Sequence, residues 1–272
     1  MELWFYGHFS SGNKGVNDTY YYYHTDFLAV HEKNERVKVD GAISSTVIFL
    51  YILRNTRNMR FDLHIHSNYS SDSGMSVDDI LRRAVKQGLD GIAICDHNTI
   101  TGSYLARKRV TELNIPLLVL PGVEVSTSKG HLIVLGVREN IQPGLTPLET
   151  IRMARQKGGI IIAAHPFKKN SIGNVEGMDI DAIETFNSRC IFGENKKAEK
   201  MAIRLGKPQV GGSDSHIIGT IGIGYTEIDA QPDEESVLNA IRKGKTRPGG
   251  RIAPISVIIF QVMGGVLRRV YL

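Results

Sequence analysis

Nine side chains that can bind a metal ion lie in short clusters along this chain, and most of them follow an apolar run. They are His64, His66, Asp72, His97, Glu124, His131, His165, Asp214 and His216. Neutral imidazoles and carboxylates are ligands that Zn²⁺, Mn²⁺ and Fe²⁺ take in proteins. Nine such groups are too many for one ion, so they predict a hydrolytic centre that holds two or three divalent metal ions.

The spacing within the clusters supports one shared site. His64 and His66 alternate with apolar residues, so on a β-strand both imidazoles point to the same face. Asp214 and His216 repeat that spacing. Other ligands end the apolar runs 92–97, 119–124 and 160–165. Each cluster alone also fits a turn cap, a salt bridge or a hydrogen-bonded histidine, but five strand ends that all finish in ligand chemistry favour a common centre.

These residues resemble the motifs of the PHP (polymerase and histidinol phosphatase) superfamily of metal-dependent phosphoesterases. The family motifs H-x-H, D-H, Glu, H-P and D-x-H occur here in order as His64-Ile65-His66, Asp96-His97, Glu124, His165-Pro166 and Asp214-Ser215-His216. Asp72 and His131 match two further metal positions, so all nine positions of the family's trinuclear form are occupied. The resemblance covers roughly residues 60–245 and implies a phosphoesterase on a distorted barrel.

Within such a centre Glu124 is expected to bridge two ions. The expected groups, whose exact partition the sequence does not fix, are His64, His66 and Asp214; His131 and His165; and Asp72, His97 and His216. A water that bridges closely spaced ions loses a proton near neutral pH and becomes the nucleophile, while the ions neutralise the phosphate oxygens. Glu124 and Asp214 are therefore expected to act in catalysis through the hydroxide that the metal ions hold.

Other polar residues near the motifs are expected to support the centre. Asp96 precedes the ligand His97 and is expected to orient an imidazole without binding metal itself. Asn187 and Arg189 follow a run that resembles a family strand end, and a basic group follows the H-P motif at Lys168 or Lys169. Lys168, Asn187 and Arg189 are expected to contact the substrate, with a solvated loop as the alternative for each.

Strand and helix patterns alternate between the motifs. Helices are predicted at residues 77–87, 104–113, 147–157, 195–205 and 234–243, with Ser76 as the N-cap of the first and Gly88 as its stop. Strands are predicted at 117–120, 160–164, 182–186 and 208–210. Ligands spread over about 150 residues meet only where strand ends converge on one mouth. The expected fold is therefore α/β, a distorted TIM-like (βα)7 barrel with the metal site at the C-terminal strand ends.

Composition and the chain ends predict the organisation and setting. With 42% hydrophobic residues, 272 residues can bury one large core, and two cysteines make no disulfide framework. The start lacks the basic region and long apolar stretch of a signal peptide, so a cytoplasmic location is expected. The apolar stretches 42–53 and 255–267 are shorter than the roughly 20 residues that span a bilayer, so core packing or an amphipathic surface element is expected and a membrane span is not.

Three segments are predicted: residues 1–58, a phosphoesterase domain at 59–245 and a basic tail at 246–272. Residues 1–58 are either a genuine extension or a mis-assigned start, with Met59 as the alternative initiator. From Arg242 onward there are seven basic residues and no acidic ones, against +5 for the whole chain. This end either attracts an anionic partner, such as nucleic acid or a membrane surface, or is simply solvated.

The substrate is predicted only as a class. The 33 residues between His131 and His165 leave little room for an inserted domain, so a compact site is expected. It would take a phosphomonoester or a terminal phosphodiester of a phosphorylated small molecule, a nucleotide or an oligonucleotide. The alternative is a non-catalytic, metal-stabilised module for protein or nucleic-acid interaction, although such a module has no reason to keep all nine ligands. The sequence does not indicate the oligomeric state.

Overall fold

The computed structural model describes residues 4–7, 21–24 and 58–259. The chain divides into two units, Met1–Ile48 and Phe49–Leu272. In the first unit, strand β1 (Trp4–Gly7) pairs antiparallel with β2 (Tyr21–His24). The apolar stretch predicted at 42–53 lies outside the described residues.

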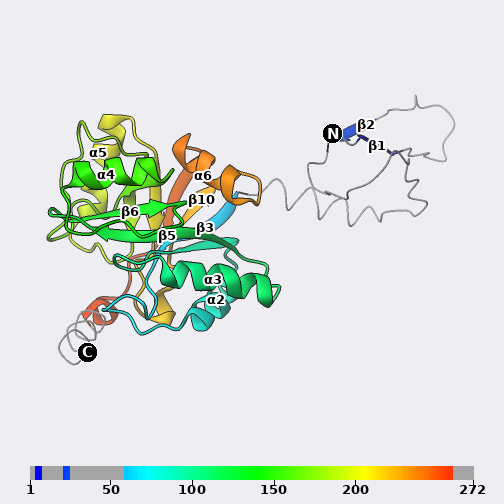
Figure 1. Cartoon of the computed structure of the whole chain (residues 1–272), viewed down its shortest axis with the longest axis horizontal. Helices are drawn as coiled ribbons and strands as arrows, with labels where there is room; N and C mark the ends of the chain where they lie inside the picture. Colours follow the sequence, from blue (N-terminus) through cyan, green and yellow to red (C-terminus); the bar gives the residue numbers. More distant parts are fainter. Residues whose placement is uncertain (1–3, 8–20, 25–57, 260–272) are drawn as a thin grey trace. The chain divides into compact units, whose positions relative to one another are not determined.

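The second unit contains a nine-stranded sheet with helices packed against it (Figure 1). Its strands are β3 (Met59–Ile65), β4 (Gly91–Ile94), β5 (Leu118–Ser126), β6 (His131–Leu135), β7 (Ile160–Ala163), β8 (Ala182–Asn187), β9 (Gln209–Gly212), β10 (Gly224–Ile228) and β11 (Thr246–Gly250). Its helices are α2 (Val77–Lys86), α3 (Thr101–Glu112), α4 (Pro147–Gln156), α5 (Glu194–Leu205) and α6 (Glu234–Arg242), with a 3-10 turn η1 (Ile218–Thr220).

The strand order is β11-β10-β3-β4-β5-β6-β7-β8-β9, and strands β3 to β9 curl into a nearly closed barrel. The two edges meet where the His66 amide donates to the Ser215 carbonyl at 2.9 Å. Strands β3 to β5 are mutually parallel, as are β7 to β9, whereas β6 is antiparallel to both neighbours. The expected distorted barrel is confirmed, with this one strand reversed.

The reversal of β6 follows from the short connection before it. Only residues 127–130 separate β5 from β6. A parallel connection needs a crossover of about a dozen residues, so this one must be a hairpin. Gly130, with φ +74°, supplies the left-handed backbone that the turn requires.

Apolar side chains fill the barrel and the layers beneath the helices. Phe61, Leu120 and Ile162 belong to the interior cluster. Helices α2 and α3 lie side by side over one part of the sheet, and α4 and α5 pack on a separate apolar cluster (Figure 1). No helix in the described part of the chain is long and apolar enough to cross a membrane.

The predicted helices are present, with one clear difference in position. Ser76 caps α2 by accepting from the Asp79 amide at 3.1 Å, and Gly88 follows the helix with φ +67°. Helix α3, however, begins at Thr101 rather than at residue 104. Its first turn lacks an apolar periodic pattern because it carries Gly102 and Ser103, which pack closely against the sheet.

The first residues of the predicted basic tail lie in the sheet. Residues 246–250 form β11, which pairs antiparallel with β10. Basic groups in this region also have acidic partners: Arg242 lies 3.4 Å from Asp181, and Arg247 pairs with Glu227. Such pairs reduce the charge that this surface presents to an anionic partner. Arg268 and Arg269 lie outside the described residues.

Candidate metal centre

The nine predicted ligand residues converge on one mouth of the barrel. Most follow the carboxyl ends of parallel strands, where such ends meet. They come from β3 and the loop after it (His64, His66, Asp72), from the ends of β4 and β5 (His97, Glu124), from β7 (His165) and from the segment after β9 (Asp214, His216). His131 is instead the first residue of β6. Because β6 runs antiparallel, its beginning lies at the same mouth as its neighbours' ends.

A β-bulge turns the first motif into the mouth. Asp62 pairs with Ile92 and Ile65 with Ile94, so β3 holds one more residue than β4 over this step. Phe61 and Leu63 belong to the interior core, while Ile65 packs in the layer beneath α2 and α3. The extra residue shifts the alternation, and His64 and His66 therefore reach the site above that core.

A second bulge acts in the same way on β8. Glu184 pairs with Val210 and Phe186 with Gly211, so β8 gains one residue over β9. On a regular strand, residues three apart point to opposite faces. Here the Asn187 amide donates to the Glu184 carboxylate at 3.1 Å, so both side chains face the site.

Glu124 occupies the centre of the cluster and is 1% exposed. Five imidazole nitrogens surround its carboxylate: His131 at 3.1 Å and His165 at 3.2 Å from Oε1, and His97 at 3.2 Å, His66 at 3.3 Å and His64 at 3.5 Å from Oε2. Burial opposes ionisation of Glu124, but His97, His64 and His131 hold its pKa well below the usual value. An anionic carboxylate with imidazoles on both oxygens is the geometry expected of a bridging ligand.

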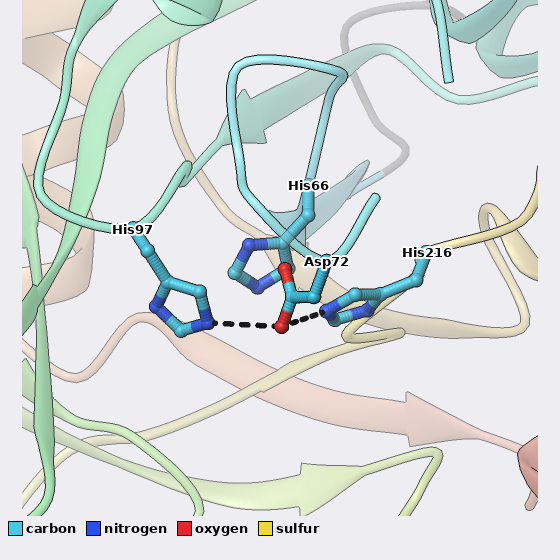
Figure 2. A group of neighbouring side chains, drawn as sticks. All are labelled: His66, Asp72, His97 and His216. Atoms are coloured by element: carbon cyan, nitrogen blue, oxygen red, sulfur yellow. Dashed lines mark ion pairs between the residues drawn. The ribbon is translucent and has the colours of Figure 1, made fainter. Parts of the chain in front are cut away.

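A second carboxylate lies between two further histidines (Figure 2). Asp72 Oδ2 is 3.4 Å from His97 Nε2 and 3.3 Å from His216 Nε2. The His66 ring faces the same group and stacks on the ring of His216 with centroids 4.3 Å apart. These four side chains come from three different loops, so the fold, and not local sequence, brings them together.

The potential ligand atoms gather into four overlapping groups, within each of which they lie no more than 4.8 Å apart. The groups are His66, Asp72, His97 and His216; His64, His66 and Asp214; His97, Glu124 and His131; and His64, His165 and Glu184. Two of them contain the sets expected from sequence around Asp214 and Asp72. His131 and His165, expected to share an ion, both lie against Oε1 of Glu124.

The donor atoms fit divalent ions in spacing and in hydrogen bonding. Ligand atoms bound tetrahedrally at about 2.1 Å lie about 3.4 Å apart. The contacts of Glu124 with its imidazoles, 3.1 to 3.5 Å, match that spacing. Glu124 Oε1 and His97 Nδ1 are buried and make no hydrogen bond, which is costly for a polar atom that has no ion to bind.

Glu184 is a functional residue that the sequence analysis missed. Its Oε1 accepts from His64 Nδ1 at 2.9 Å, and its Oε2 accepts from the backbone amide of His165 at 2.8 Å. It is 1% exposed. A carboxylate that takes the outer nitrogen of an imidazole fixes the tautomer and orients the ring. The signal in the sequence was an acidic residue within the strand Ala182–Asn187, directly after Ile183.

Hydroxyl and carbonyl groups engage the outer nitrogens of three other histidines. Ser70 Oγ lies 3.0 Å from His66 Nδ1, and Ser171 Oγ lies 3.1 Å from His165 Nδ1. Nδ1 of His216 lies 3.0 Å from the carbonyl oxygen of Asp214. In each ring the Nε2 atom is then directed to the shared centre. Serines are too common in loops for sequence to have indicated these two.

Asp96 holds a loop, whereas an imidazole contact was expected. Its Oδ1 accepts from the Ser67 amide and its Oδ2 from the Ser67 hydroxyl, both at 2.6 Å. Burial raises the pKa of Asp96 to about 6, although the hydrogen bonds from Ser67 oppose that shift. Because Ser67 follows His66 directly, Asp96 acts on that ligand through the backbone.

The three residues expected to contact substrate meet at Asp214. Lys168 Nζ lies 2.7 Å from Oδ2, Arg189 Nη1 lies 3.0 Å from Oδ1, and the Asn187 amide lies 3.3 Å from Oδ2. Burial opposes ionisation of Asp214, but Arg189 and Lys168 hold its pKa well below the usual value. The mouth thus carries two cations beside its cluster of imidazoles and carboxylates.

Comparison with known proteins agrees with this geometry. The family model described as the PHP domain matches residues 62–182, and one described as PHP-associated matches residues 192–246. An uncharacterized protein of Methanocaldococcus jannaschii is 36% identical over 143 residues, which are 48% of this chain and 82% of that protein. The chain belongs to the PHP family of metal-dependent phosphoesterases, so it falls in a class of phosphoester hydrolases.

A relative with a named activity and a solved structure are also similar. A protein of Haemophilus influenzae named 5'-3' exoribonuclease is 34% identical over 108 residues, 38% of this chain and 38% of that protein. A Bacteroides vulgatus structure, described as a two-domain protein containing a predicted PHP-like metal-dependent phosphoesterase, aligns with a TM-score of 0.61 at 15% identity. The alignment covers 76% of this chain and 69% of that one, and it supports the shared fold.

Proposed function

We propose that this protein hydrolyses a phosphomonoester or a terminal phosphodiester with the help of two or three divalent metal ions. The observation that carries the proposal is the position of Glu124, whose buried carboxylate is within 3.5 Å of imidazoles from five separate motif positions. Family membership supports the class of reaction, and the cluster of imidazoles and carboxylates supports a role for metal ions in it. The metal ions, whether Zn²⁺, Mn²⁺ or Fe²⁺, would be held by the nine residues expected from sequence.

The proposed ligand sets follow the groups of neighbouring donors. His64, His66 and Asp214 would hold one ion, and Glu124 would link it to a second ion held with His131 and His165. Asp72, His97 and His216 would complete a third position. Divalent ions in such a centre supply a nucleophilic water at neutral pH and neutralise charge on the phosphate.

Lys168, Arg189 and Asn187 would bind the phosphate next to the centre. Their polar atoms lie 2.7 to 3.3 Å from Asp214, so a phosphate beside that residue is within their reach. Arginine offers a planar fork of donors to phosphate oxygens, and lysine a point charge. Asn187 would donate a neutral hydrogen bond, held in place by Glu184. Asp96 would keep His66 in position through Ser67.

The substrate we favour is a nucleotide or a short oligonucleotide. The similar Haemophilus influenzae protein is named as an exoribonuclease, although the match covers 38% of each chain. The basic C-terminal region adds little, because Arg242 and Arg247 are paired with acids. A phosphorylated small molecule therefore stays within the proposal. We also place the protein in the cytoplasm, which fits the free, buried thiols of Cys95 and Cys190.

A substrate panel with metal analysis tests this function. Purified protein is loaded with Mn²⁺, Zn²⁺ or Fe²⁺, and release of phosphate or nucleotide is measured from histidinol phosphate, nucleoside bisphosphates and 5'-phosphorylated oligonucleotides. We expect metal-dependent release from at least one class, abolished in Glu124→Gln. A folded, metal-loaded protein that acts on none of them contradicts the proposal.

A further inference from the structure

The barrel closes at a seam between β9 and β3, which we define as the contact of residues 211–215 with residues 62–66. β9 is one end of the sheet order, whereas β3 lies inside it between β10 and β4. The backbone pairing that joins the two sides of the seam, among the described residues, is the isolated bridge of Ile65 with Ser215. The Ser215 amide also donates to the His64 carbonyl at 3.3 Å. A regular ladder does not join the strands, so side chains must contribute to this closure.

Asp62 is the side chain that bridges the seam. Its Oδ1 accepts from the amides of Ser213 at 2.9 Å and His64 at 3.3 Å. Its Oδ2 accepts from the Ser213 hydroxyl at 2.5 Å and from the Gly222 amide at 2.8 Å. Asp62 is fully buried, and hydrogen bonds to a buried carboxylate are the strong ones. One carboxylate thus joins the bulge of β3 to the segment that follows β9.

The strands approach each other closely at this point. A Cβ on Gly212 would lie 2.5 Å from Cβ of His64, so only glycine allows the approach. Ser213 is fixed further by its hydroxyl, which lies 2.5 Å from that of Ser215. Asp62 and Ser213 each stand two residues or fewer from a proposed metal ligand, on opposite sides of the seam.

Some groups of proposed metal ligands include residues from both sides of the seam, and one does not. The group of His64 and His66 with Asp214 takes ligands from both sides of it. The group of Figure 2 does so too, because His216 follows β9 while its other members follow β3 and β4. Glu124, His131 and His165, the proposed ligands of the second ion, instead come from β5, β6 and the end of β7, which continuous ladders hold together.

We propose that Asp62 is a positioning residue which, through Ser213, sets the affinity of the ions bound across the seam and not of the ion between Glu124, His131 and His165. The inference rests on the ligand sets proposed above. Without the Asp62 contacts, the end of β9 can move relative to the bulge of β3. The metal-binding atoms on the two sides of the seam then no longer keep the spacing that one ion requires. Donors within the β5 to β7 ladders keep theirs.

Metal titration of variants tests this role. Mn²⁺ binding to the full chain is measured by calorimetry and by metal content per chain after dialysis, for the wild type, Asp62→Asn and Ser213→Ala. In Asp62→Asn we expect the ions whose ligands come from both sides of the seam to bind about 10- to 100-fold more weakly. That range is the usual effect of losing a group that orients a metal ligand. At least one ion should stay bound with affinity within about threefold of the wild type. Ser213→Ala, which removes one of the four hydrogen bonds, should give a smaller shift of the same ions.

Asp181→Asn is the matched control. Asp181 is also a buried carboxylate, but it lies away from the seam. It accepts a hydrogen bond from the amide of Ile161, at the beginning of β7, at 2.7 Å, and it forms an ion pair with Arg155. This variant should lower the melting temperature and leave Mn²⁺ binding unchanged. Unaltered binding in Asp62→Asn, or an equal loss of affinity at every ion, overturns the role of Asp62.

Three further outcomes are also decisive. If Asp62→Asn does not fold, Ser213→Ala alone tests the role. Weaker Mn²⁺ binding at some ions only supports it, and unchanged Mn²⁺ binding contradicts it. Phosphate release is not needed for this test. A chain that binds Mn²⁺ as expected yet hydrolyses no substrate contradicts the proposed function and still decides the role of Asp62. A wild-type chain that binds no Mn²⁺ contradicts the ligand sets and this role with them.

Discussion

Glu184 accepts a hydrogen bond from Nδ1 of His64 at 2.9 Å, and this one contact determines which nitrogen of His64 faces the centre. A carboxylate only accepts, so Nδ1 carries a proton, and Nε2 is the nitrogen that is directed toward Glu124 and Asp214. His64 is completely buried. Glu184 therefore prepares a ligand without needing to bind metal itself.

Glu184→Gln is expected to weaken metal binding by about 10- to 100-fold, the usual effect of losing a group that orients a ligand. The amide keeps the shape but loses the negative charge that holds the Nδ1 proton. Competition with a chelator of known affinity measures the change. Glu199→Gln, on the exposed face of α5, is the control and should bind metal as the wild type does. Equal affinities in the two variants would contradict the orienting role.

Lys168→Ala and Arg189→Ala are expected to lower kcat/KM by about 10- to 100-fold each, because a hydrogen bond to a charged group contributes about 1.5 to 3 kcal/mol. Steady-state hydrolysis of the best substrate from the panel measures this effect, with bound metal determined in parallel. Lys169→Ala changes the exposed neighbouring residue and should have little effect. If Lys168→Ala and Lys169→Ala behave alike, Lys168 does not bind the phosphate.

Gly102→Ala is expected to destabilise the protein by about 1 to 3 kcal/mol, as overpacking does. Glycine to alanine inside a helix normally stabilises, by roughly 0.5 to 1 kcal/mol. Here the added Cβ would lie 2.0 Å from Asp96 Oδ2 and 2.4 Å from Ser67 Oγ, the contact that holds the loop after His66. Chemical denaturation measures the free energy of unfolding.

Gly219→Ala is the matched control, since its added Cβ would have no atom within 4 Å. It should leave the free energy of unfolding nearly unchanged. A Gly102→Ala protein as stable as the wild type would show that the first turn of α3 does not constrain Asp96.

The sequence predicts most of the site because ligand chemistry is local. His64, His66 and their counterparts stand at the ends of apolar runs, and the convergence of strand ends then brings them together whatever the details of the connections. Glu124 at the centre is the clearest case, since sequence predicts it as a bridging ligand and the structure places five imidazoles around it.

Features that depend on register were harder to predict. The residue types at the two bulges do not predict them, since Asp62 and Thr185 look like ordinary strand positions. Asp62 and Glu184 are buried acids whose partners lie 151 and 120 residues away, and no local pattern encodes such pairing. The antiparallel direction of β6 could have been predicted, because the four residues that connect it to β5 are too few for a parallel crossover.

The measurement that tests the central claim most directly is metal-dependent turnover of one preparation through removal and return of its ions. The purified chain is assayed on the substrate panel, stripped with a chelator, assayed again and reconstituted with Mn²⁺, with metal content determined at each stage. The account predicts at least two ions per chain and hydrolysis that disappears with them and returns with Mn²⁺. In Glu124→Gln it predicts fewer bound ions and no restored activity. Hydrolysis that survives complete removal of metal, or a fully loaded chain that releases no phosphate or nucleotide, would contradict it.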